Sequence, residues 1–462
     1  INNLHYEKFQ DGTVKCIEDE IPFEVPEGWA WCKLNDIYNF IDYRGATPTK
    51  ITNGIPLVTA KNVKSGYIDY TIDDYISEEE FKERQQRGIS KKGDILFTTE
   101  APLGNAALAD MEKFSAGQRL ITFQQYGSKD ELINYVMLMF ILSDFFQQQL
   151  YVNKTGSTVA GIKAAILKTL WIPVPPYNEQ LRISNTLKSA INLIDSISKN
   201  KEILSTSISN TKSKILDLAI RGKIVPQDPN DEPASVLLER IRAEKEELIK
   251  QGKIKRDKKE SVIFKGDDNS YYLRTGGVEE SLEDWRFDDL PETWKICCLW
   301  ELCDYGDCIN VNTEDIAEDA WILDLEDIEK DTGTVLKKVT KAQRNSVSTK
   351  HKFHSGQVLY SKLRPYLNKV VLSDADGYCT SEILPLEFKN CVLPEYARYY
   401  LMSGTFIAYA NHCSYGVKMP RLGTTDGKKA IFSLPPLSEQ KRIVETIDFC
   451  FMQLNKISEA LA

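Results

Sequence analysis

Apolar residues recur at alternating steps of four and three positions in two stretches of the chain. Nine of the eleven such positions from 183 to 218 are apolar, and so are all six from 443 to 461. A mean spacing of about 3.5 residues is typical of a coiled-coil seam, whereas a helix on a globular core drifts toward about 3.6. We therefore expect two long helices that pair with each other. The expected seam consists of Ile183, Leu187, Ile194, Ile197, Leu204, Ile208, Ile443, Ile447, Leu454 and Ile457.

Each expected helix follows the same motif, Pro-Pro-x-x-Glu-Gln, at 175–180 and at 435–440. Two prolines can precede a helix but not occupy its interior, and Asn178 and Ser438 are suitable N-cap residues. The motif glutamate then falls in the first turn, where negative charge is favoured. The first helix should run about 40 residues to Gly222, hence roughly 60 Å. The alternative is that each is only an amphipathic surface helix of its own domain.

The chain contains two copies of one pattern. Pro-Glu-x-Trp-x-x-Cys-x-Leu at 26–34 recurs at 291–299. Gly-Asp-Ile-Leu-Phe at 93–97, followed by a proline and an asparagine, recurs as Gly-Gln-Val-Leu-Tyr at 356–360 with the same two residues after it. The order of the motifs is kept, which indicates two copies of one globular unit. Between the motifs lie short Ile, Val, Tyr and Phe runs separated by Gly, Pro and Asn, with a helical stretch such as 132–150. These features predict an α+β class.

The 462 residues, with a mass of 52.6 kDa, suffice for two to four domains. A shorter helix, which follows the first long helix in the sequence, should end near Gly252, and a charged linker should follow it at 253–259. We expect an N-terminal arm at 1–20, a first module at 21–176, a helical spacer and linker at 177–284, a second module at 285–435 and a second spacer helix at 436–462.

Composition and charge narrow the class of protein. The net charge of −9 means that any polyanion site must be local. The longest apolar run, 135–142, is far shorter than the roughly 18 residues that span a bilayer, and the first residues show no signal pattern, so we expect a cytoplasmic protein. The ten cysteines include no Cys-x-x-Cys, which favours buried thiols over disulfides or a zinc ribbon.

Basic residues without neighbouring acids gather in four blocks. Residues 337–369 carry nine Lys or Arg and no acid, directly after the acidic segment 310–331, and smaller acid-free blocks lie at 43–68, 145–178 and 396–425. Cations that no carboxylate neutralises attract polyanions, although each block alone could be a solvated face. The expected DNA contacts are Arg44, Thr47, Lys50, Lys61, Asn62, Lys64, Lys154, Thr155, Ser157, Lys163, Lys350, His351, Lys352, Ser361, Lys362, Arg364, Tyr366, Lys369, Lys418 and Arg421.

A search for catalytic motifs finds only incomplete ones. Val-Pro-Pro-Tyr at 174–177 lacks the leading Asn of the adenine-methyltransferase loop, and the Gly-rich segment 423–429 has the wrong spacing for a phosphate loop. His351 and His354 have no third metal ligand beside them in the sequence. We therefore expect no catalytic residues and no metal site in this chain.

The two modules with their helices resemble the DNA specificity subunit of type I restriction-modification systems. The resemblance rests on Phe-x-x-Pro-Glu-x-Trp at 23–29, on 223–235 and on 434–443. It implies two target-recognition domains that read a bipartite, gapped site in double-stranded DNA, and an antiparallel coiled coil that positions two methyltransferase subunits. It also implies restriction subunits in the full complex, no catalysis in this chain, and S-adenosylmethionine and ATP on the partner subunits.

Two other functions remain open from the residues alone. One is an autonomous DNA methyltransferase or nuclease, and the other is a coiled-coil protein adaptor without DNA binding. The second of the two long helices has only about two dozen residues after Glu439. Part of the seam on the first long helix would therefore lack a partner within residues 1–462.

Overall fold

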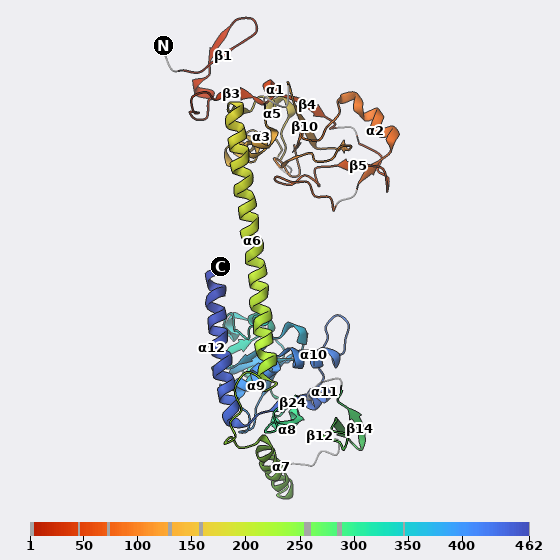
Figure 1. Ribbon diagram of the computed structural model, residues 1–462, viewed down its shortest axis with the longest axis vertical. Coiled ribbons are helices and arrows are strands. Elements are labelled where there is room, and N and C mark those ends of the chain that lie inside the picture. The colour runs from red at the N-terminus through yellow and green to blue at the C-terminus, as the bar shows by residue number, and fades with distance from the viewer. Residues whose placement is uncertain are drawn as a thin grey trace. The chain divides into compact units, whose positions relative to one another are not determined.

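The computed structural model describes residues 4–44, 47–71, 74–127, 132–156, 160–253, 260–283, 289–344 and 347–461. The chain divides into two compact units, Ile1–Ser198 (unit 1) and Lys199–Ala462 (unit 2). Helix α6 (Tyr177–Ala219), with 43 residues, contributes its first half to unit 1 and its second half to unit 2 (Figure 1). The predicted helix of about 40 residues is thus confirmed, as is the mixture of helices and strands.

Unit 1 contains mostly short strands. They are β1 (Tyr6–Lys8), β2 (Val14–Cys16), β3 (Ala30–Lys33), β4 (Tyr38–Asp42), β5 (Ile55–Val58), β6 (Tyr75–Ile76), β7 (Ile95–Thr98), β8 (Ala106–Leu108), β9 (Ser115–Ala116), β10 (Leu120–Gln125) and β11 (Trp171–Val174). The helices that precede α6 are α1 (Leu34–Ile37), α2 (Glu78–Arg84), α3 (Asn134–Ile141), α4 (Asp144–Val152) and α5 (Ala164–Leu167), with 3-10 turns η1 (Glu18–Glu20) and η2 (Gln85–Arg87). The sheets have the orders β4-β10-β7-β8, β6-β5-β9, β3-β11 and β1-β2.

Unit 2 is also built from short strands and helices, and one of its sheets has five strands. Its strands are β12 (Ser261–Lys265), β13 (Tyr271–Thr275), β14 (Val278–Ser281), β15 (Lys295–Cys298), β16 (Ile309–Val311), β17 (Trp321–Leu323), β18 (Val339–Thr340), β19 (Lys350–Phe353), β20 (Val358–Ser361), β21 (Val370–Leu372), β22 (Gly377–Thr380), β23 (Ile383–Leu386) and β24 (Ile431–Leu434). Its other helices are α7 (Ala234–Lys250), α8 (Leu299–Leu302), α9 (Pro394–Leu401), α10 (Gly404–His412), α11 (Thr424–Lys429) and α12 (Leu437–Leu461), with 3-10 turns η4 (Thr313–Asp315), η5 (Leu325–Asp327), η6 (Lys341–Gln343) and η7 (Pro365–Leu367). The sheet orders are β12-β13-β14, β15-β24, β16-β19-β22-β17-β18 and β21-β20-β23.

The second copy repeats the elements of the first. β3 pairs with β11 as β15 pairs with β24, and β7 lies between β8 and β10 as β20 lies between β21 and β23. The helical stretch expected at 132–150 is broken into α3 and α4, because Ser143 caps a new helix by accepting a hydrogen bond from the Phe146 amide. Ser403 caps α10 in the same way through Phe406. The duplication read from the motifs therefore extends to the break between two helices.

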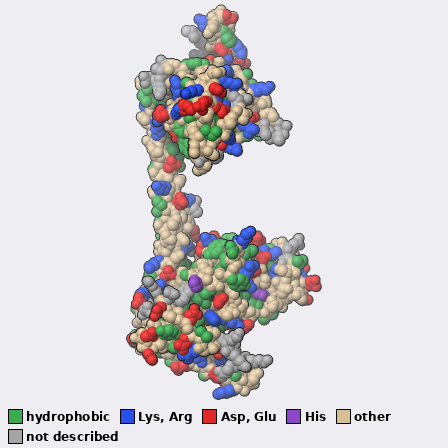
Figure 2. Space-filling view, turned by 90° about the vertical axis from the view of Figure 1, so that its right-hand side faces the viewer, with side chains coloured by type: hydrophobic (Ala, Val, Ile, Leu, Met, Phe, Trp, Pro, Cys, Tyr) green, Lys and Arg blue, Asp and Glu red, His purple; other side chains and the backbone are tan. Residues whose placement is uncertain are grey.

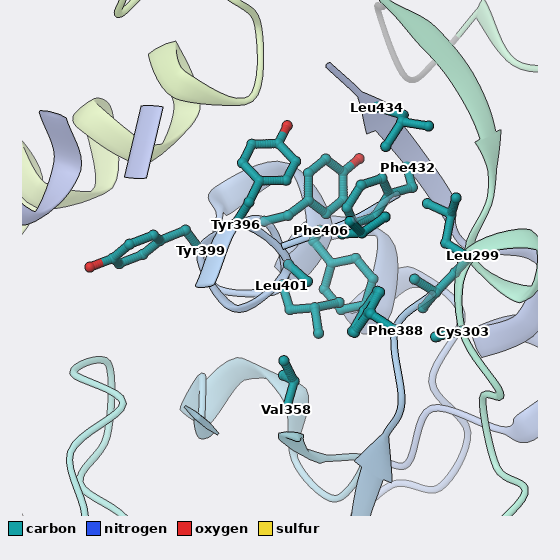
Figure 3. Close-up of a cluster of buried hydrophobic side chains, with 14 of the residues drawn as sticks. Leu299, Cys303, Val358, Phe388, Tyr396, Tyr399, Leu401, Phe406, Phe432 and Leu434 are labelled. Carbon is teal, nitrogen blue, oxygen red and sulfur yellow. The ribbon is translucent and has the colours of Figure 1, made fainter. Parts of the chain in front are cut away.

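Each unit has its own aromatic core. In unit 1 the rings of Phe97 and Phe123 stack with centroids 5.3 Å apart. In unit 2 the Tyr400 and Phe432 rings lie 4.1 Å apart, and Figure 3 shows Tyr396, Phe406 and Phe432 gathered between the helices and strand β24. Burial of such rings is a large source of stability.

The motif residues at the starts of α6 and α12 make hydrogen bonds that hold each unit together. The Trp29 indole donates to the Glu179 carboxylate at 3.1 Å, and in unit 2 the Trp294 indole donates to Glu439 at 2.9 Å. Each following glutamine accepts a backbone N–H, from Ile133 to Gln180 at 2.7 Å and from Leu393 to Gln440 at 2.8 Å. The Pro-Glu-x-Trp and Pro-Pro-x-x-Glu-Gln motifs thus bind each other. Asn178 and Ser438 lie one residue inside their helices, so they are not N-caps.

The expected seam residues have different surroundings. Ile183 packs against the core of unit 1, while Ile194 and Ile197 are 59% and 58% exposed. In unit 2, Ile443 and Ile447 of α12 share the core with Leu216 and Ala219 at the end of α6. The two helices run antiparallel there, with the Lys212 ammonium 2.6 Å from the Asn455 amide oxygen. Leu187 and Leu454 are half-buried, Ile208 is buried, and Leu204 and Ile457 are exposed.

The structure bears on three further expectations, which concern the linker, the cysteines and membrane-spanning helices. The segment interpreted as spacer and linker contains the sheet β12-β13-β14, and residues 254–259 of its charged run lie outside the described residues. All ten cysteines are free; five are buried, but Cys16 is exposed, so the expectation of buried thiols is wrong there. Burial raises the pKa of Cys298 to about 12. Among the described residues, no helix has both the length and the apolar character that a membrane span needs.

Candidate nucleic-acid interface

Two neighbouring loops of unit 1 are joined by backbone hydrogen bonds. One loop, 99–105, follows β7, and the other, 155–161, precedes α5. Thr155 and Gly161 donate to each other's carbonyls at 2.7 and 3.0 Å, which closes the second loop. The Ile162 amide donates to the Thr99 carbonyl at 3.0 Å, which fastens this loop to the first. Residues 157–159, including the expected contact Ser157, lie outside the described residues.

Unit 2 has the same pair of loops at 362–368 and 415–421. Tyr415 and Arg421 donate to each other's carbonyls at 3.1 and 3.0 Å, and the Leu422 amide donates to the Lys362 carbonyl at 3.0 Å. These bonds join the same positions of the repeat as in unit 1. We call the two loops together the paired loops of each unit.

The paired loops contain left-handed backbone at residues other than glycine. Ala101 has φ 47° and Arg364 has φ 50°, and both precede a proline; Asn368 has φ 48°. Such conformations are uncommon outside glycine and cluster at functional sites. The left-handed residue before the proline thus recurs at one position of both units, although its side chain differs.

The exposed side chains of the paired loops differ between the units. In unit 1 they are small or hydroxylic, with Ala101, Pro102 and Thr155 exposed. In unit 2, Tyr366 is 48% exposed and Tyr415 is 62% exposed. Val417, Lys418 and Met419 are exposed beside Tyr415. The same backbone frame therefore presents two different chemical surfaces.

The first part of the strongest basic block, residues 337–344, is neutralised in the fold. Lys338 pairs with Asp374 at 2.6 Å, and Lys341 pairs with Glu318 at 3.0 Å. Arg344 binds Asp324 at 2.6 Å and also Asp327. The acidic segment 310–331 supplies most of these partners, so the premise that the block lacks acidic neighbours is wrong for 337–344.

Several expected DNA contacts also have partners within their unit. Arg44 pairs with Asp42 at 2.6 Å, Lys50 with Asp74 at 2.7 Å, and Arg421 with Glu382 at 2.8 Å. The Lys154 ammonium lies 3.3 Å from the centroid of the Tyr151 ring. The Lys369 ammonium donates to the Leu325 carbonyl at 2.6 Å, and Thr47 accepts from the Gln118 amide. Contacts of these residues with phosphates would compete with the bonds already made.

Four expected contacts are buried: Asn62, Lys350, His351 and Ser361 are 2% to 7% exposed. The Asn62 side chain holds a turn by accepting from the Thr59 amide at 3.0 Å. The Lys350 ammonium donates to the Ser348 hydroxyl at 2.8 Å, and burial lowers the pKa of His351, whose ring contacts the Ile383 carbonyl at 2.8 Å. Ser361 donates to the Leu363 carbonyl at 3.0 Å. These arrangements assign the four side chains a structural role and argue against direct DNA contact.

The remaining expected cations have no carboxylate within ion-pair distance among the residues that the structure describes. On the face drawn in Figure 2, basic and acidic side chains are interspersed on both units. Any DNA surface is therefore built from local groups of cations. The expected cations without a carboxylate partner among the described residues are Lys61, Lys64, Lys163, Lys352, Lys362, Arg364 and Lys418.

The two neighbouring histidines have separate surroundings. His351 is buried against a carbonyl, whereas the exposed His354 lies 2.7 Å from Glu387. The Ser355 carbonyl and Glu387 raise the pKa of His354. Within the described ranges, no three His, Cys, Asp or Glu side chains gather as metal ligands would.

Comparison with known families identifies the class of protein that this duplicated fold represents. The family described as "Type I restriction modification DNA specificity domain" matches residues 26–205 and 291–460. The two matches cover more than half of the chain and coincide with the two copies of the repeat. The chain belongs to this family.

The relatives are specificity subunits. The chain is 26% identical to the type I restriction enzyme EcoAI specificity subunit of Escherichia coli, over 95% of this chain and 80% of that protein. It is 27% identical to the MjaVIII specificity subunit of Methanocaldococcus jannaschii, over 44% of this chain and 47% of that protein. The predicted family is confirmed, and with it the prediction that the chain is a specificity component rather than an enzyme.

Solved structures share the fold. The HsdS subunit from Thermoanaerobacter tengcongensis matches with a TM-score of 0.52 and 16% identity, over 96% of this chain and 93% of that chain. A structure described as the basis of "complex assembly and conformational transition of the type I R-M system" matches with a TM-score of 0.58 and 16% identity, over 95% and 94% of the two chains.

The sequence reasoning missed most of the exposed residues in the second loop of unit 2. Tyr415, Val417 and Met419 are uncharged, so a search for basic blocks does not select them. A signal for them does exist, because Thr-Gly-Ser-Thr at 155–158 and Tyr-Gly-Val-Lys at 415–418 share only the glycine at matching places of the repeat. Dissimilar loops within a shared frame mark positions where the two units present different side chains.

Proposed function

We propose that the chain reads a bipartite, gapped target in double-stranded DNA, with the paired loops of each unit contacting one half of the site. The observation that carries this proposal is the recurrence of one hydrogen-bonded loop frame with different exposed side chains. A common frame gives both units the same approach to a duplex, while different side chains select different base edges.

The chemistry of the loops fits a division between positioning and reading. In unit 2 the cations Lys362, Arg364 and Lys418 would contact phosphates, while Tyr415 and Val417 offer a hydroxyl and apolar surface for base edges such as the thymine methyl. In unit 1, Thr155 of the paired loops would provide a hydroxyl, and Lys163, two residues beyond them, would provide a cation.

We further propose that α6 and α12 form an antiparallel coiled coil that positions two methyltransferase subunits, with restriction subunits in the full complex. Exposed apolar side chains support protein contacts there, since Leu193 of α6 and Phe449 of α12 are 62% and 60% exposed. S-adenosylmethionine and ATP would be bound by the partner subunits in the cytoplasm, where the DNA is.

The test is to map methylated adenines in cells that contain this chain together with its methyltransferase partner. The expected result is one gapped motif. Replacing Tyr415 and Val417 by alanine should relax one half of that motif and leave the other half unchanged. The matched control replaces the similarly exposed Tyr67 and Tyr70, which lie outside the paired loops, and should leave both halves unchanged.

Two outcomes would refute the proposal. If the paired-loop variant relaxed both halves equally, or neither, the loops would not read half-sites. If gel shifts with gapped duplexes failed even with the methyltransferase partner present, the chain would be a protein adaptor.

A further inference from the structure

Each unit carries an ion pair between an arginine and a glutamate at the base of its paired loops. In unit 2 the Arg421 guanidinium binds the Glu382 carboxylate, through Nη2 at 2.8 Å and through Nε at 3.1 Å. In unit 1 the Nε of Arg119 lies 3.0 Å from the Glu100 carboxylate. The four side chains are between 24% and 55% exposed, so both pairs are open to solvent.

The two pairs occupy one place in the repeat with their charges exchanged. The Thr99 amide donates to the Arg119 carbonyl at 3.0 Å, and in unit 2 the Lys362 amide donates to the Glu382 carbonyl at 3.0 Å. Arg119 of unit 1 therefore corresponds to Glu382 of unit 2. This position of the frame supplies the arginine in one unit and the glutamate in the other.

The partner of each exchanged residue comes from the bridged loops. A β-bridge joins Glu100 to Gly161 in unit 1, and the matching bridge joins Leu363 to Arg421 in unit 2. A Cβ atom added to Gly161 would lie 3.7 Å from the Glu100 carboxylate. Because Gly161 has no side chain where Arg421 has one, the carboxylate has room to reach Arg119. An ion pair is thus present in both units although its residues come from different positions.

Arg421 lies beside an exposed residue that the proposed function places against the bases. A second antiparallel bridge sets Arg421 opposite Tyr415, and residues directly opposite each other project from one face. Tyr415 is 62% exposed, and the Arg421 side chain is 32% exposed. The guanidinium therefore belongs to the surface of the paired loops.

The Arg421 guanidinium keeps donors for a further acceptor while Glu382 holds it. Nε and Nη2 form the side that the carboxylate binds, and Nη1 donates to the Met419 carbonyl at 3.2 Å. Nη1 and Nη2 carry two N–H groups each, so one N–H of each has no partner within the described part of the chain. Guanine presents two acceptors, N7 and O6, in the major groove, and a planar pair of N–H groups matches them.

We propose that Arg421 reads one guanine in the half-site of unit 2 and that Arg119 reads one guanine in the half-site of unit 1. Glu382 and Glu100 are positioning residues, because each holds its arginine in place before DNA binds. This inference rests on the proposed function, and it assigns a base contact to Arg421 in place of a phosphate contact. A base contact through the outer edge leaves the ion pair intact, whereas a phosphate would compete with the carboxylate.

The experiment uses the full chain with its methyltransferase partner and begins with the gapped motif that the unchanged chain methylates. Arg421→Lys keeps the charge but loses the planar pair of donors. One guanine of one half-site should then become degenerate in the methylation map, and the preference for guanine there should fall about tenfold in gel shifts. The other positions should keep their preference, which also shows that the variant is folded.

A modified duplex tests the acceptor directly. Replacing that guanine by 7-deazaguanine removes the N7 acceptor and keeps the base pair. The unchanged chain should bind this duplex several-fold more weakly than the natural one, while Arg421→Lys should bind the two about equally. Glu382→Ala should weaken the preference at the same guanine, and Glu382→Gln, which keeps an acceptor for the guanidinium, should restore most of it.

A matched control and the other unit complete the test. Arg274 binds Glu279 through the same side of its guanidinium, with Nε at 2.9 Å and Nη2 at 2.7 Å, but it lies on the β13-β14 hairpin outside the paired loops. Arg274→Lys should leave every base preference unchanged. Arg119→Lys should relax one guanine of the half-site that Arg421→Lys leaves intact.

The inference is overturned if the gapped motif exists but Arg421→Lys and Arg119→Lys leave all base preferences unchanged. The two ion pairs would then be structural, and the proposed function would stand. It is also overturned if Arg421→Lys weakens binding to all sequences equally, since the arginine would then contact a phosphate. Absence of any gapped motif for the unchanged chain would instead refute the proposed function, and this inference with it.

Discussion

Replacing Glu439 by alanine should destabilise unit 2 by about 2 to 3 kcal/mol. The carboxylate accepts the Trp294 indole N–H at 2.9 Å and the Gln227 amide at 2.5 Å. Glu439 is fully buried and Trp294 is 4% exposed, so the indole loses its acceptor where water cannot replace it. An unpaired buried donor costs about 1 to 3 kcal/mol, and the exposed Gln227 adds about 1 kcal/mol. Relief of the buried charge offsets part of this loss.

Unit 1 provides the matched control. Among the described residues, the Trp29 indole is the one donor to the Glu179 carboxylate, at 3.1 Å, and both side chains are half-buried. Because water reaches this site, Glu179→Ala should lower the free energy of unfolding by only about 1 kcal/mol. Urea unfolding followed by circular dichroism gives the total change, and hydrogen exchange of β3-β11 and β15-β24 assigns it to a unit. Equal losses for the two variants would refute the reasoning.

A pH series sharpens the same prediction. Burial is the main cause that raises the pKa of Glu439 above its ordinary value of 4.5. The folded state then holds the proton more tightly than the unfolded chain. The resulting stabilisation is complete below the unfolded pKa and is lost as pH rises through the folded pKa. Glu439→Gln retains an acceptor for the indole, so its stability should gain on that of the unmodified chain above pH 4.5. Parallel pH profiles would contradict this explanation.

Two other predictions concern DNA affinity and packing. Replacing both Lys362 and Lys418 by alanine should lower the slope of log affinity against log salt by about 1.8, because two phosphate contacts are lost. The control Lys338→Ala removes a cation that is paired with Asp374 at 2.6 Å, so it should leave the slope unchanged. DNA titrations at several salt concentrations distinguish the two variants. Gly427→Ala would place a Cβ 2.1 Å from the Tyr305 ring, so the unfolding midpoint should fall by the equivalent of about 1 to 3 kcal/mol, and an unchanged midpoint would show that the ring can move aside.

Local patterns predicted much of this fold. The long helix followed from its 3.5-residue spacing and its proline start, and the two modules followed from collinear motifs. The hydrogen bond between Trp294 and Glu439 could not be predicted, because 145 positions separate the two residues. Strands β12 to β14 were missed because each has only four or five residues and lies beside a charged run.

The site was harder to predict than the fold. A count of charges along the sequence treats 310–331 and 337–344 as separate blocks, but the sheet brings Asp324 and Arg344 within 2.6 Å. Burial of Lys350 likewise depends on which face of β19 packs inward, and the sequence pattern of a four-residue strand does not determine this. Uncharged residues such as Tyr415 give no electrostatic signal.

The pairing of β3 with β11 has a consequence for how such proteins diversify. Lys33 lies opposite Trp171, so the chain enters and leaves the module at adjacent strands, and the bond between Trp29 and Glu179 closes the same junction. The two ends of the segment between β3 and β11 therefore meet at one junction. A segment from another protein with the same ends could replace it without disturbing the start of the helix that follows. Recombination at these short sequences would then exchange the whole surface that the module presents in a single step.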